Sequence, residues 1–159
     1  MDIQALLRQA YKIARDNSDD PNTQNAALLL REGKVVLAGW NYFVGEMTAE
    51  KLERPEKYDH FSHAETDVLF RAARFGIPTD GATIICPWYA CSPCAIGLGT
   101  AGIEKIIGHQ ASYDCSKPSW QRAIDKGLKK LDFYGVKHEW WDGEVGGVEI
   151  KFNDKLWAP

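Results

Sequence analysis

The spacing of hydrophobic residues near the N-terminus predicts a helix followed by a β-hairpin. In residues 1–17 apolar side chains recur every three or four positions, which is the period of an amphipathic helix. Two apolar runs follow, at residues 25–30 and 35–40, on either side of the polar turn Arg31-Glu32-Gly33-Lys34. Apolar runs joined by a short polar segment with glycine are typical of a hairpin, so we expect the sheet to begin here.

The next segment, residues 41–61, has no regular period and predicts a long loop. It carries Gly45, Pro55 and many charged residues. Connections of this length are uncommon in compact domains, and those that occur are usually functional or mobile. We therefore expect this loop to serve function or to move.

From residue 63 onward, helical and strand-like patterns alternate. Helical spacing begins at His63 and stops before Gly76, with Pro78 just beyond, which is a usual helix ending. The predicted elements are a helix at 63–75, a buried strand at 82–86, a helix at 92–101, a strand at 105–108, a helix at 117–130, a strand at 136–141 and a hairpin at 148–157 that turns near Asn153-Asp154.

Strands that alternate with helices after an opening hairpin imply a layered α/β protein. We expect a three-layer α/β/α domain with a mixed five-stranded sheet and a C-terminal hairpin extension. The chain shows no internal repeat or interdomain linker. We therefore expect residues 1–159 to form a single domain, with a core at about 1–141 and an extension at 142–159.

Composition mainly excludes classes of protein. Of the 159 residues, 45% are hydrophobic and 26% charged, and the net charge is −3, as in an ordinary globular protein. The apolar runs are far shorter than a membrane span, and residues 1–17 do not look like a signal peptide, so we expect no membrane association and a cytoplasmic location, in a host cytoplasm if the protein is viral. The basic residues are scattered, so we expect no nucleic acid polymer as partner.

Two short motifs carry candidate metal chemistry. Cys91 and Cys94 are spaced by two residues at the start of a predicted helix, where they face the same way and where the helix N-terminus favours thiolates. His63 opens another predicted helix and would be a third ligand. Three protein ligands leave a tetrahedral Zn²⁺ one open position, which is typical of catalytic rather than structural sites.

Glu65 is the candidate for proton transfer. It lies two residues after His63, so on an ideal helix its side chain points about 200° away from that of the histidine. This argues against both residues ligating one ion. A carboxylate beside the metal can instead take a proton from activated water and pass it to a substrate.

Each motif also has a plainer interpretation. Ser62-His63-Ala64-Glu65 fits a capping box, in which Glu65 only satisfies the helix start. A single CxxC occurs in redox pairs and in half of a structural zinc site, for which Cys86, Cys115, His60 or His109 could supply a fourth ligand. Together and in this order, however, the two motifs match the zinc deaminase signature.

The sequence resembles the zinc-dependent cytidine and deoxycytidylate deaminases over most of residues 1–141, and is most similar to the phage-type deoxycytidylate deaminases. The residues that carry the resemblance are Ser18-Asp19-Asp20-Pro21-Asn22-Thr23-Gln24, Gly39-Trp40-Asn41, His63-Ala64-Glu65, Cys91 to Cys94 with Ala95 and Ala101-Gly102-Ile103, and Tyr113-Asp114 with Lys117-Pro118-Ser119-Trp120.

The resemblance implies that the three-layer α/β/α domain is cytidine-deaminase-like. It also implies a hydrolytic deaminase of a free nucleotide, with dCMP converted to dUMP and ammonia. It implies attack of activated water at C4 of the cytosine ring, with Glu65 protonating N3 and then the leaving amine. It assigns Asn41 to a sugar hydroxyl and the backbone of Ala64 to the base. Trp88 and Tyr89 stand where they could wall the base pocket or be ordinary core aromatics. A homo-oligomer is a further implication.

Three departures from the family pattern leave the substrate open. Ala90 replaces the proline that usually precedes the first ligand cysteine, which should alter loop stiffness more than metal binding. Asn25 stands where valine is common and would line the base pocket, and Asp67 stands where asparagine is common. A purine or modified cytosine is therefore an alternative substrate, and a non-catalytic, zinc-stabilised binding module is an alternative of another class.

Overall fold

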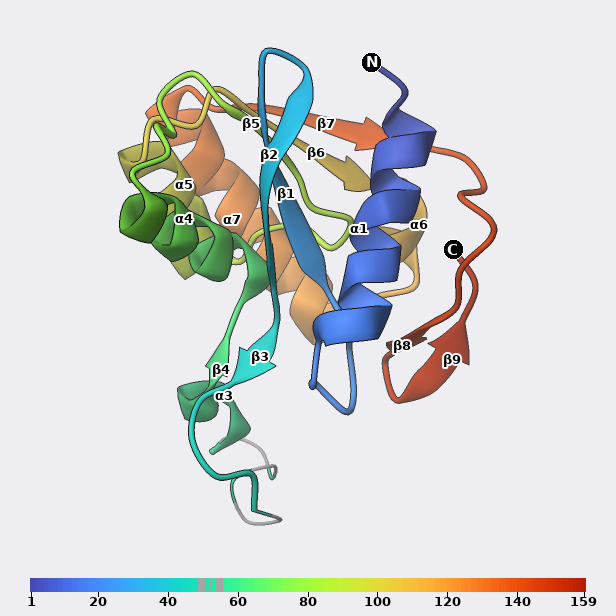
Figure 1. Ribbon diagram of the computed structural model, residues 1–159. Coiled ribbons are helices and arrows are strands. Elements are labelled where there is room, and N and C mark those ends of the chain that lie inside the picture. The colour runs from blue at the N-terminus through green and yellow to red at the C-terminus, as the bar shows by residue number, and fades with distance from the viewer. Residues whose placement is uncertain (49–50, 52, 54–55) are drawn as a thin grey trace.

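The computed structural model describes residues 1–48, 51, 53 and 56–159, and a five-stranded mixed sheet organises them (Figure 1). The spatial order is β2 (Lys34–Trp40), β1 (Ala26–Arg31), β5 (Thr83–Ile85), β6 (Lys105–His109) and β7 (Lys137–Trp141). β1 runs antiparallel to both β2 and β5, whereas β5, β6 and β7 are parallel. The predicted fold class is confirmed.

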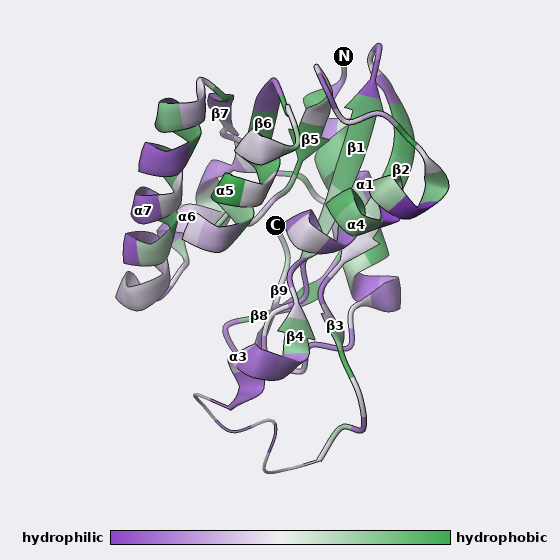
Figure 2. Cartoon of the chain, turned by 90° about the vertical axis from the view of Figure 1, so that its left-hand side faces the viewer, coloured by the Kyte–Doolittle hydropathy of each residue, from purple (hydrophilic) through white to green (hydrophobic). Residues whose placement is uncertain are grey.

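The sheet separates two hydrophobic clusters because successive strand residues point to opposite faces. Ala27 and Leu29 of β1 belong to the cluster under α4 (Ala64–Phe75), α5 (Ser92–Thr100) and α7 (Pro118–Tyr134). Leu28 and Leu30 belong to the cluster under α1 (Ile3–Asn17) and the C-terminal hairpin. Figure 2 shows the resulting pattern, with hydrophobic strands in the middle and hydrophilic residues on helices such as α7.

The predicted long loop at 41–61 is only partly a loop. Within its described part, β3 (Tyr42–Phe43) pairs antiparallel with β4 (Phe61–Ser62), and α3 (Lys57–His60) directly precedes β4. Two-residue strands are too short to show a period, and the Phe43 and Phe61 rings, 5.2 Å apart, hold the ribbon together. The part of the prediction that falls on residues 49, 50, 52, 54 and 55, including Pro55, lies outside the described residues.

Two other elements differ from expectation. The short helix α6 (Gln110–Asp114) was not predicted, and α7 continues to Tyr134, where Gly135 ends it in the left-handed conformation. The predicted terminal hairpin exists as β8 (Ile150–Phe152) and β9 (Lys155–Trp157), and Asn153 and Asp154 form its turn with positive φ angles. This pair therefore has the backbone that tight hairpin turns favour.

Helix α4 packs directly on strand β2 at Gly39. A Cβ atom there would lie 2.4 Å from the backbone nitrogen of Val68 and 2.9 Å from the carbonyl oxygen of Ala64. Only glycine allows this approach, which fixes the N-terminal end of α4 against the sheet.

Among the described residues, no helix combines the length and the hydrophobicity that crossing a bilayer requires.

Candidate active site

His63 and Cys91 occupy equivalent places at the start of two helices. Each is an N-cap residue in extended conformation, His63 for α4 and Cys91 for α5. Their carbonyl oxygens accept the first helical hydrogen bonds, from Asp67 and Ala95 respectively. Cys94 lies in the first turn of α5. The positive ends of both helix dipoles therefore meet at this point and favour negatively charged ligands.

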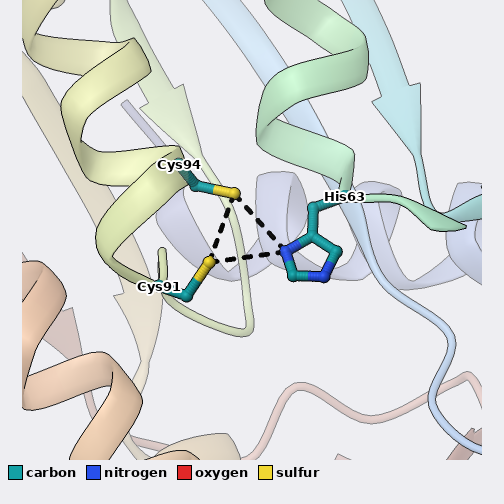
Figure 3. Close-up of side chains that lie close together, drawn as sticks. All are labelled: His63, Cys91 and Cys94. Carbon is teal, nitrogen blue, oxygen red and sulfur yellow. Dashed lines mark hydrogen bonds between the residues drawn. The ribbon is translucent and has the colours of Figure 1, made fainter. Parts of the chain in front are cut away.

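The three predicted ligands converge on one point, as Figure 3 shows. The sulfur atoms of Cys91 and Cys94 are 3.6 Å apart, and they lie 3.5 Å and 3.4 Å from Nδ1 of His63. Tetrahedral zinc, with bonds of about 2.3 Å to sulfur and about 2.0–2.1 Å to nitrogen, places its ligand atoms roughly 3.5–3.8 Å apart. The donor set and its spacing thus fit Zn²⁺ without rearrangement.

The pKa values of the two cysteine thiols are shifted in opposite directions. The hydrogen bond with Cys94 and the interaction with His63 lower the pKa of Cys91 to about 4, although burial opposes this. The hydrogen bond with Cys91 and burial raise the pKa of Cys94. The metal-free site therefore favours one thiolate and one thiol, and binding of a metal ion must displace the remaining proton.

Competing effects determine the pKa of the His63 imidazole. Burial lowers its pKa, but the hydrogen bond with Cys91 and the negative charge of Glu65 outweigh burial and raise the pKa to about 9. A cationic imidazole cannot ligate a metal through the protonated nitrogen, so zinc binding would expel this proton as well.

Glu65 lies beside the three ligands with its side chain inside the protein. The residue is only 3% exposed, and burial raises the pKa of its carboxyl to about 7. A carboxyl group with a pKa near neutrality can both accept and donate a proton, which a proton-transferring residue requires.

The plainer interpretations of both motifs fail on geometry. The N-cap of α4 is His63 rather than Ser62, so the predicted capping box does not form. Among the described residues, His63, Cys91 and Cys94 are the one group of three metal-binding side chains, and none of the candidate fourth ligands Cys86, Cys115, His60 and His109 joins it. Cys86 donates to the Trp88 carbonyl, and His109 binds Tyr11. The site has three protein ligands, as catalytic zinc sites do.

A small cavity of about 20 Å³ lies beside the metal-binding point. Its lining residues are Asn25, Asn41, His63, Glu65, Trp88, Tyr89, Cys91 and Trp120. All of the predicted site residues other than Cys94 and Ala64 therefore line one small space, in which Glu65 lies together with the predicted ligands His63 and Cys91.

Residues 1–110 match the sequence model described as "Cytidine and deoxycytidylate deaminase zinc-binding region". The chain belongs to this family. Zinc is accordingly the cofactor for which His63, Cys91 and Cys94 are placed.

Curated relatives match the chain over limited regions. ComE operon protein 2 of Bacillus subtilis (strain 168) is 27% identical over 107 residues, which are 65% of the chain and 56% of that protein. The deoxycytidylate deaminase of Enterobacteria phage T2 is 36% identical over 58 residues, 36% of the chain and 30% of that enzyme. The chain thus spans about half or less of the length of these relatives.

The deaminase fold also matches a solved structure. The dCMP deaminase of cyanophage S-TIM5, in complex with dCMP and dUMP, superposes with a TM-score of 0.65 at 19% identity, covering 87% of the chain and 95% of that protein. At this identity the likeness concerns the fold.

Asn41 connects the end of β2 to the start of α4. Its Oδ1 accepts the backbone N–H of Ala64 at 2.9 Å, and its Nδ2 donates to the Thr23 carbonyl at 3.3 Å. The family resemblance assigns the backbone of Ala64 to the base, and the N–H of that backbone is engaged by Asn41. Asn41 keeps one N–H and one lone pair for a further partner such as a sugar hydroxyl.

Asn25 lines the cavity, but its amide holds the loop that follows β5. Its Nδ2 donates to the Trp88 carbonyl at 3.2 Å and to the sulfur of Cys86 at 3.3 Å, and its Oδ1 accepts the Trp88 N–H at 3.4 Å. Asn25, the polar residue that stands where valine is common, therefore holds Trp88 in place.

Asp67 does not line this cavity. Its carboxylate accepts the backbone N–H of Trp40 at 3.0 Å and the Nε–H of Arg71 at 2.8 Å. Asp67, which stands where the family often has asparagine, therefore joins α4 to β2 and lies outside the lining of the cavity.

The two predicted wall residues differ in position. Trp88 is half-buried, and its indole Nε1–H donates to the hydroxyl of Ser116 at 2.8 Å. Tyr89 is buried, stacks on Trp140 with ring centroids 4.0 Å apart, and donates its hydroxyl to the Ile106 carbonyl. Tyr89 thus borders the cavity, but its hydroxyl is bonded within the sheet.

Ala90 and Cys91 contact helix α7 without intervening side chains. A Cβ atom at Gly127 would lie 2.1 Å from the carbonyl oxygen of Ala90. The alanine that replaces the usual proline is thus held by packing against α7, which fixes the loop that leads into Cys91.

Trp120 is the cavity residue that sequence reasoning missed. Its ring lies 6.5 Å from that of His63, 4.8 Å from Trp88 and 5.8 Å from Tyr58 of α3. Trp120 stands in the stretch compared with phage-type enzymes, but only the packing of α7 reveals that it faces the metal site. A second hollow toward the surface is lined by Trp120, Tyr58 and the buried ion pair of Lys57 with Asp20, 2.7 Å.

Proposed function

We propose that this protein is a hydrolytic deaminase of a free nucleotide, and that it converts dCMP to dUMP and ammonia. The observation that carries the proposal is the placement of buried Glu65 beside three ligands for one zinc ion, in the lining of a small cavity. A metal centre with an open position and an adjacent carboxyl near neutrality is suited to adding water to a ring carbon.

The chain's own residues divide the work. Zinc, when bound, supplies the Lewis acid that activates water. Glu65 takes a proton from the attacking water, gives it to ring nitrogen N3, and carries the second proton of the water to the departing amine. The exocyclic C4–N bond breaks and a C4=O bond remains, so water and the amino group become the carbonyl oxygen and ammonia. Trp88 and Trp120 cover the cavity walls and limit competing water.

The choice of dCMP rests on likeness. The fold neighbour from cyanophage S-TIM5 is a dCMP deaminase that binds dCMP and dUMP, and the phage T2 relative is a deoxycytidylate deaminase. Both likenesses are modest in identity or extent, so the base and its phosphorylation state are the parts of the proposal that most need a test.

A substrate panel tests this proposal. Zinc-loaded protein is incubated with cytosine, cytidine, deoxycytidine, CMP, dCMP, dCTP and adenine and guanine compounds, and released ammonia is measured. The highest kcat/KM with dCMP supports the proposal. Turnover of a purine or a modified cytosine in its place would keep the chemistry and overturn the substrate.

The binding-module alternative gives a different pattern. A non-catalytic, zinc-stabilised module would bind one zinc ion per chain and release no ammonia from any member of the panel. Its Glu65→Gln variant would also bind ligands as tightly as the wild type, whereas in a deaminase the same variant keeps zinc and loses turnover.

We further propose a homo-oligomer that acts in the cytoplasm. A groove between α4 and α5, lined mainly by apolar residues such as Leu69, Phe70 and Ile77, lies on the surface, and Phe70 is 69% exposed. Exposed apolar surface of this kind marks contact sites in many proteins. Replacing Phe70 with Asp should shift the mass measured by light scattering to that of a monomer, and an unchanged mass would remove this face as the contact.

A further inference from the structure

The C-terminal hairpin, residues 148–159, lies outside the part of the chain that matches the family model. Its strands β8 and β9 form their own two-stranded sheet, separate from the central one (Figure 1). We propose that this hairpin braces the substrate cavity, with Phe152 and Asn153 as its positioning residues. The hairpin contacts each of three segments that carry cavity residues.

The first contact is with the segment that leads into β1. Gln24 donates its backbone N–H to the Lys151 carbonyl, and Lys151 donates its own to Oε1 of Gln24, both at 2.9 Å. The Asn153 N–H donates to the hydroxyl of Thr23 at 3.2 Å. The hairpin thus holds residues 22–24 in place through hydrogen bonds of its backbone, as an added strand would.

This first contact reaches the metal site through one intermediate. The carbonyl of Thr23 accepts from Asn41, which in turn holds the N–H of Ala64 between the ligand His63 and Glu65. A shift of residues 22–24 would therefore move the Thr23 carbonyl, which is the hydrogen-bond partner of Asn41. Asn41 in turn orients the start of α4.

The second contact is aromatic. Phe152 is buried, and its ring packs edge-on against Trp88 with centroids 5.6 Å apart. Trp88 is held from the other side by Ser116 and Trp120. Phe152 therefore fills the space behind Trp88, and without it the indole has room to leave the cavity wall.

The third contact is with the turn between α6 and α7. Nδ2 of Asn153 donates to the Cys115 carbonyl at 2.8 Å, and Lys117 forms an ion pair with Asp154 at 3.1 Å. This turn leads directly into Trp120. The hairpin is also anchored on the α1 side of the sheet, where Trp157 packs against Tyr11 and His109.

A mild variant tests the brace without threatening the fold. Asn153 has φ 51°, so Asn153→Gly suits the turn and removes only the tether to Cys115. Glu32, with the same φ of 51° in the β1–β2 turn, gives the matched control Glu32→Gly. In hydrogen–deuterium exchange, residues 115–120 should exchange roughly five- to tenfold faster in Asn153→Gly than in the wild type or the control. Equal exchange in all three would overturn the proposal.

A second pair of variants tests Phe152 and rests on the proposed deaminase function. Phe152→Ala should raise KM about tenfold or more and change kcat little, because the cavity wall moves while zinc and Glu65 stay. Phe152→Leu should restore most of the affinity. Leu7→Ala, in the same hydrophobic cluster on α1, controls for lost stability and should leave KM unchanged.

The outcomes separate the two claims. If the protein releases no ammonia at all, the proposed function fails, while the exchange of residues 115–120 still decides the brace. If Phe152→Ala binds zinc at one ion per chain and keeps the wild-type KM, or if Leu7→Ala raises KM equally, Phe152 has no positioning role.

Discussion

Oδ1 of Asn41 accepts a hydrogen bond from the backbone N–H of Ala64 at 2.9 Å. Ala64 lies between His63 and Glu65, so this bond joins the end of β2 to the point where the metal ligand and the acid/base residue leave the chain. The bond replaces a side-chain cap on α4, since the N-cap residue His63 forms none.

Removal of this bond should reduce both stability and turnover. Asn41→Ala leaves the buried N–H of Ala64 without its partner, which costs about 1–3 kcal/mol in the free energy of unfolding. We also expect kcat/KM for dCMP to fall about tenfold or more, because small displacements at a reacting centre are costly. Asn17→Ala, which removes an exposed amide hydrogen bond to Ile13, is the control for denaturation and kinetics. Wild-type kinetics in Asn41→Ala would contradict the proposed linkage.

The close approach of α4 to β2 gives a prediction about Gly39. Gly39→Ala would place its Cβ against the backbone of Val68 and should lower the free energy of unfolding by about 1–3 kcal/mol or more. Gly97→Ala in α5 meets only the end of the Leu69 side chain, at 3.5 Å, and should be neutral or stabilising. Urea denaturation compares the two variants, and equal stabilities would show that the packing at Gly39 tolerates a methyl group.

Trp120 should contribute to substrate binding. Its ring borders His63 and Trp88 in the cavity, so Trp120→Ala should raise KM about tenfold, while Trp120→Phe keeps an aromatic face and should change it less. Phe133 lies on the same helix at 81% exposure, and Phe133→Ala should behave as the wild type. Initial rates at varied dCMP concentration make the comparison, and an unchanged KM in Trp120→Ala would place the substrate elsewhere.

His109 should make stability depend on pH. It is buried, its Nδ1 accepts from the Tyr11 hydroxyl, and its Nε2–H donates to the Gly143 carbonyl. Burial lowers its pKa, although the Gly143 carbonyl and the charges of Asp142 and Asp114 oppose this. The unfolded chain therefore binds a proton at about pH 6.5 that the folded protein accepts only at lower pH, so stability falls as pH drops below about 6.5.

The variant His109→Gln separates this effect from general acid denaturation. The difference in unfolding free energy between wild type and variant should shrink as pH falls from about 7.5 to about 5.5 and then level off. A difference that stays constant over this range would show that His109 titrates alike in the folded and unfolded states.

The sequence was sufficient for those parts of the site that lie close together in the chain. His63, Glu65, Cys91 and Cys94 form two short motifs at helix starts, and local patterning places helix starts well. Residues that depend on long-range packing were harder to place. Trp120 reaches the cavity only because α7 packs on Ala90 through Gly127, and Asp67 points to Trp40 and Arg71 rather than to the substrate.

The same distinction applies to the fold. The long periodic elements and the mixed sheet followed from hydrophobic spacing, whereas β3, β4 and α6 were missed because they have only two to five residues each. For the C-terminal tail, the sequence predicted a hairpin but not its place, and the hairpin packs on Trp88 and His109 of its own chain. That residues 1–159 form one domain stays a prediction, which a single cooperative unfolding transition would support.

The most direct test of the central claim compares ammonia release from dCMP by the wild type and by Glu65→Gln at equal zinc content. The wild type should release one ammonia per dUMP formed. The variant should bind one zinc ion per chain, unfold like the wild type and turn over about 10²- to 10⁴-fold more slowly, because the proton-transferring carboxyl is gone. Turnover at the wild-type rate by a zinc-loaded Glu65→Gln variant would contradict the account.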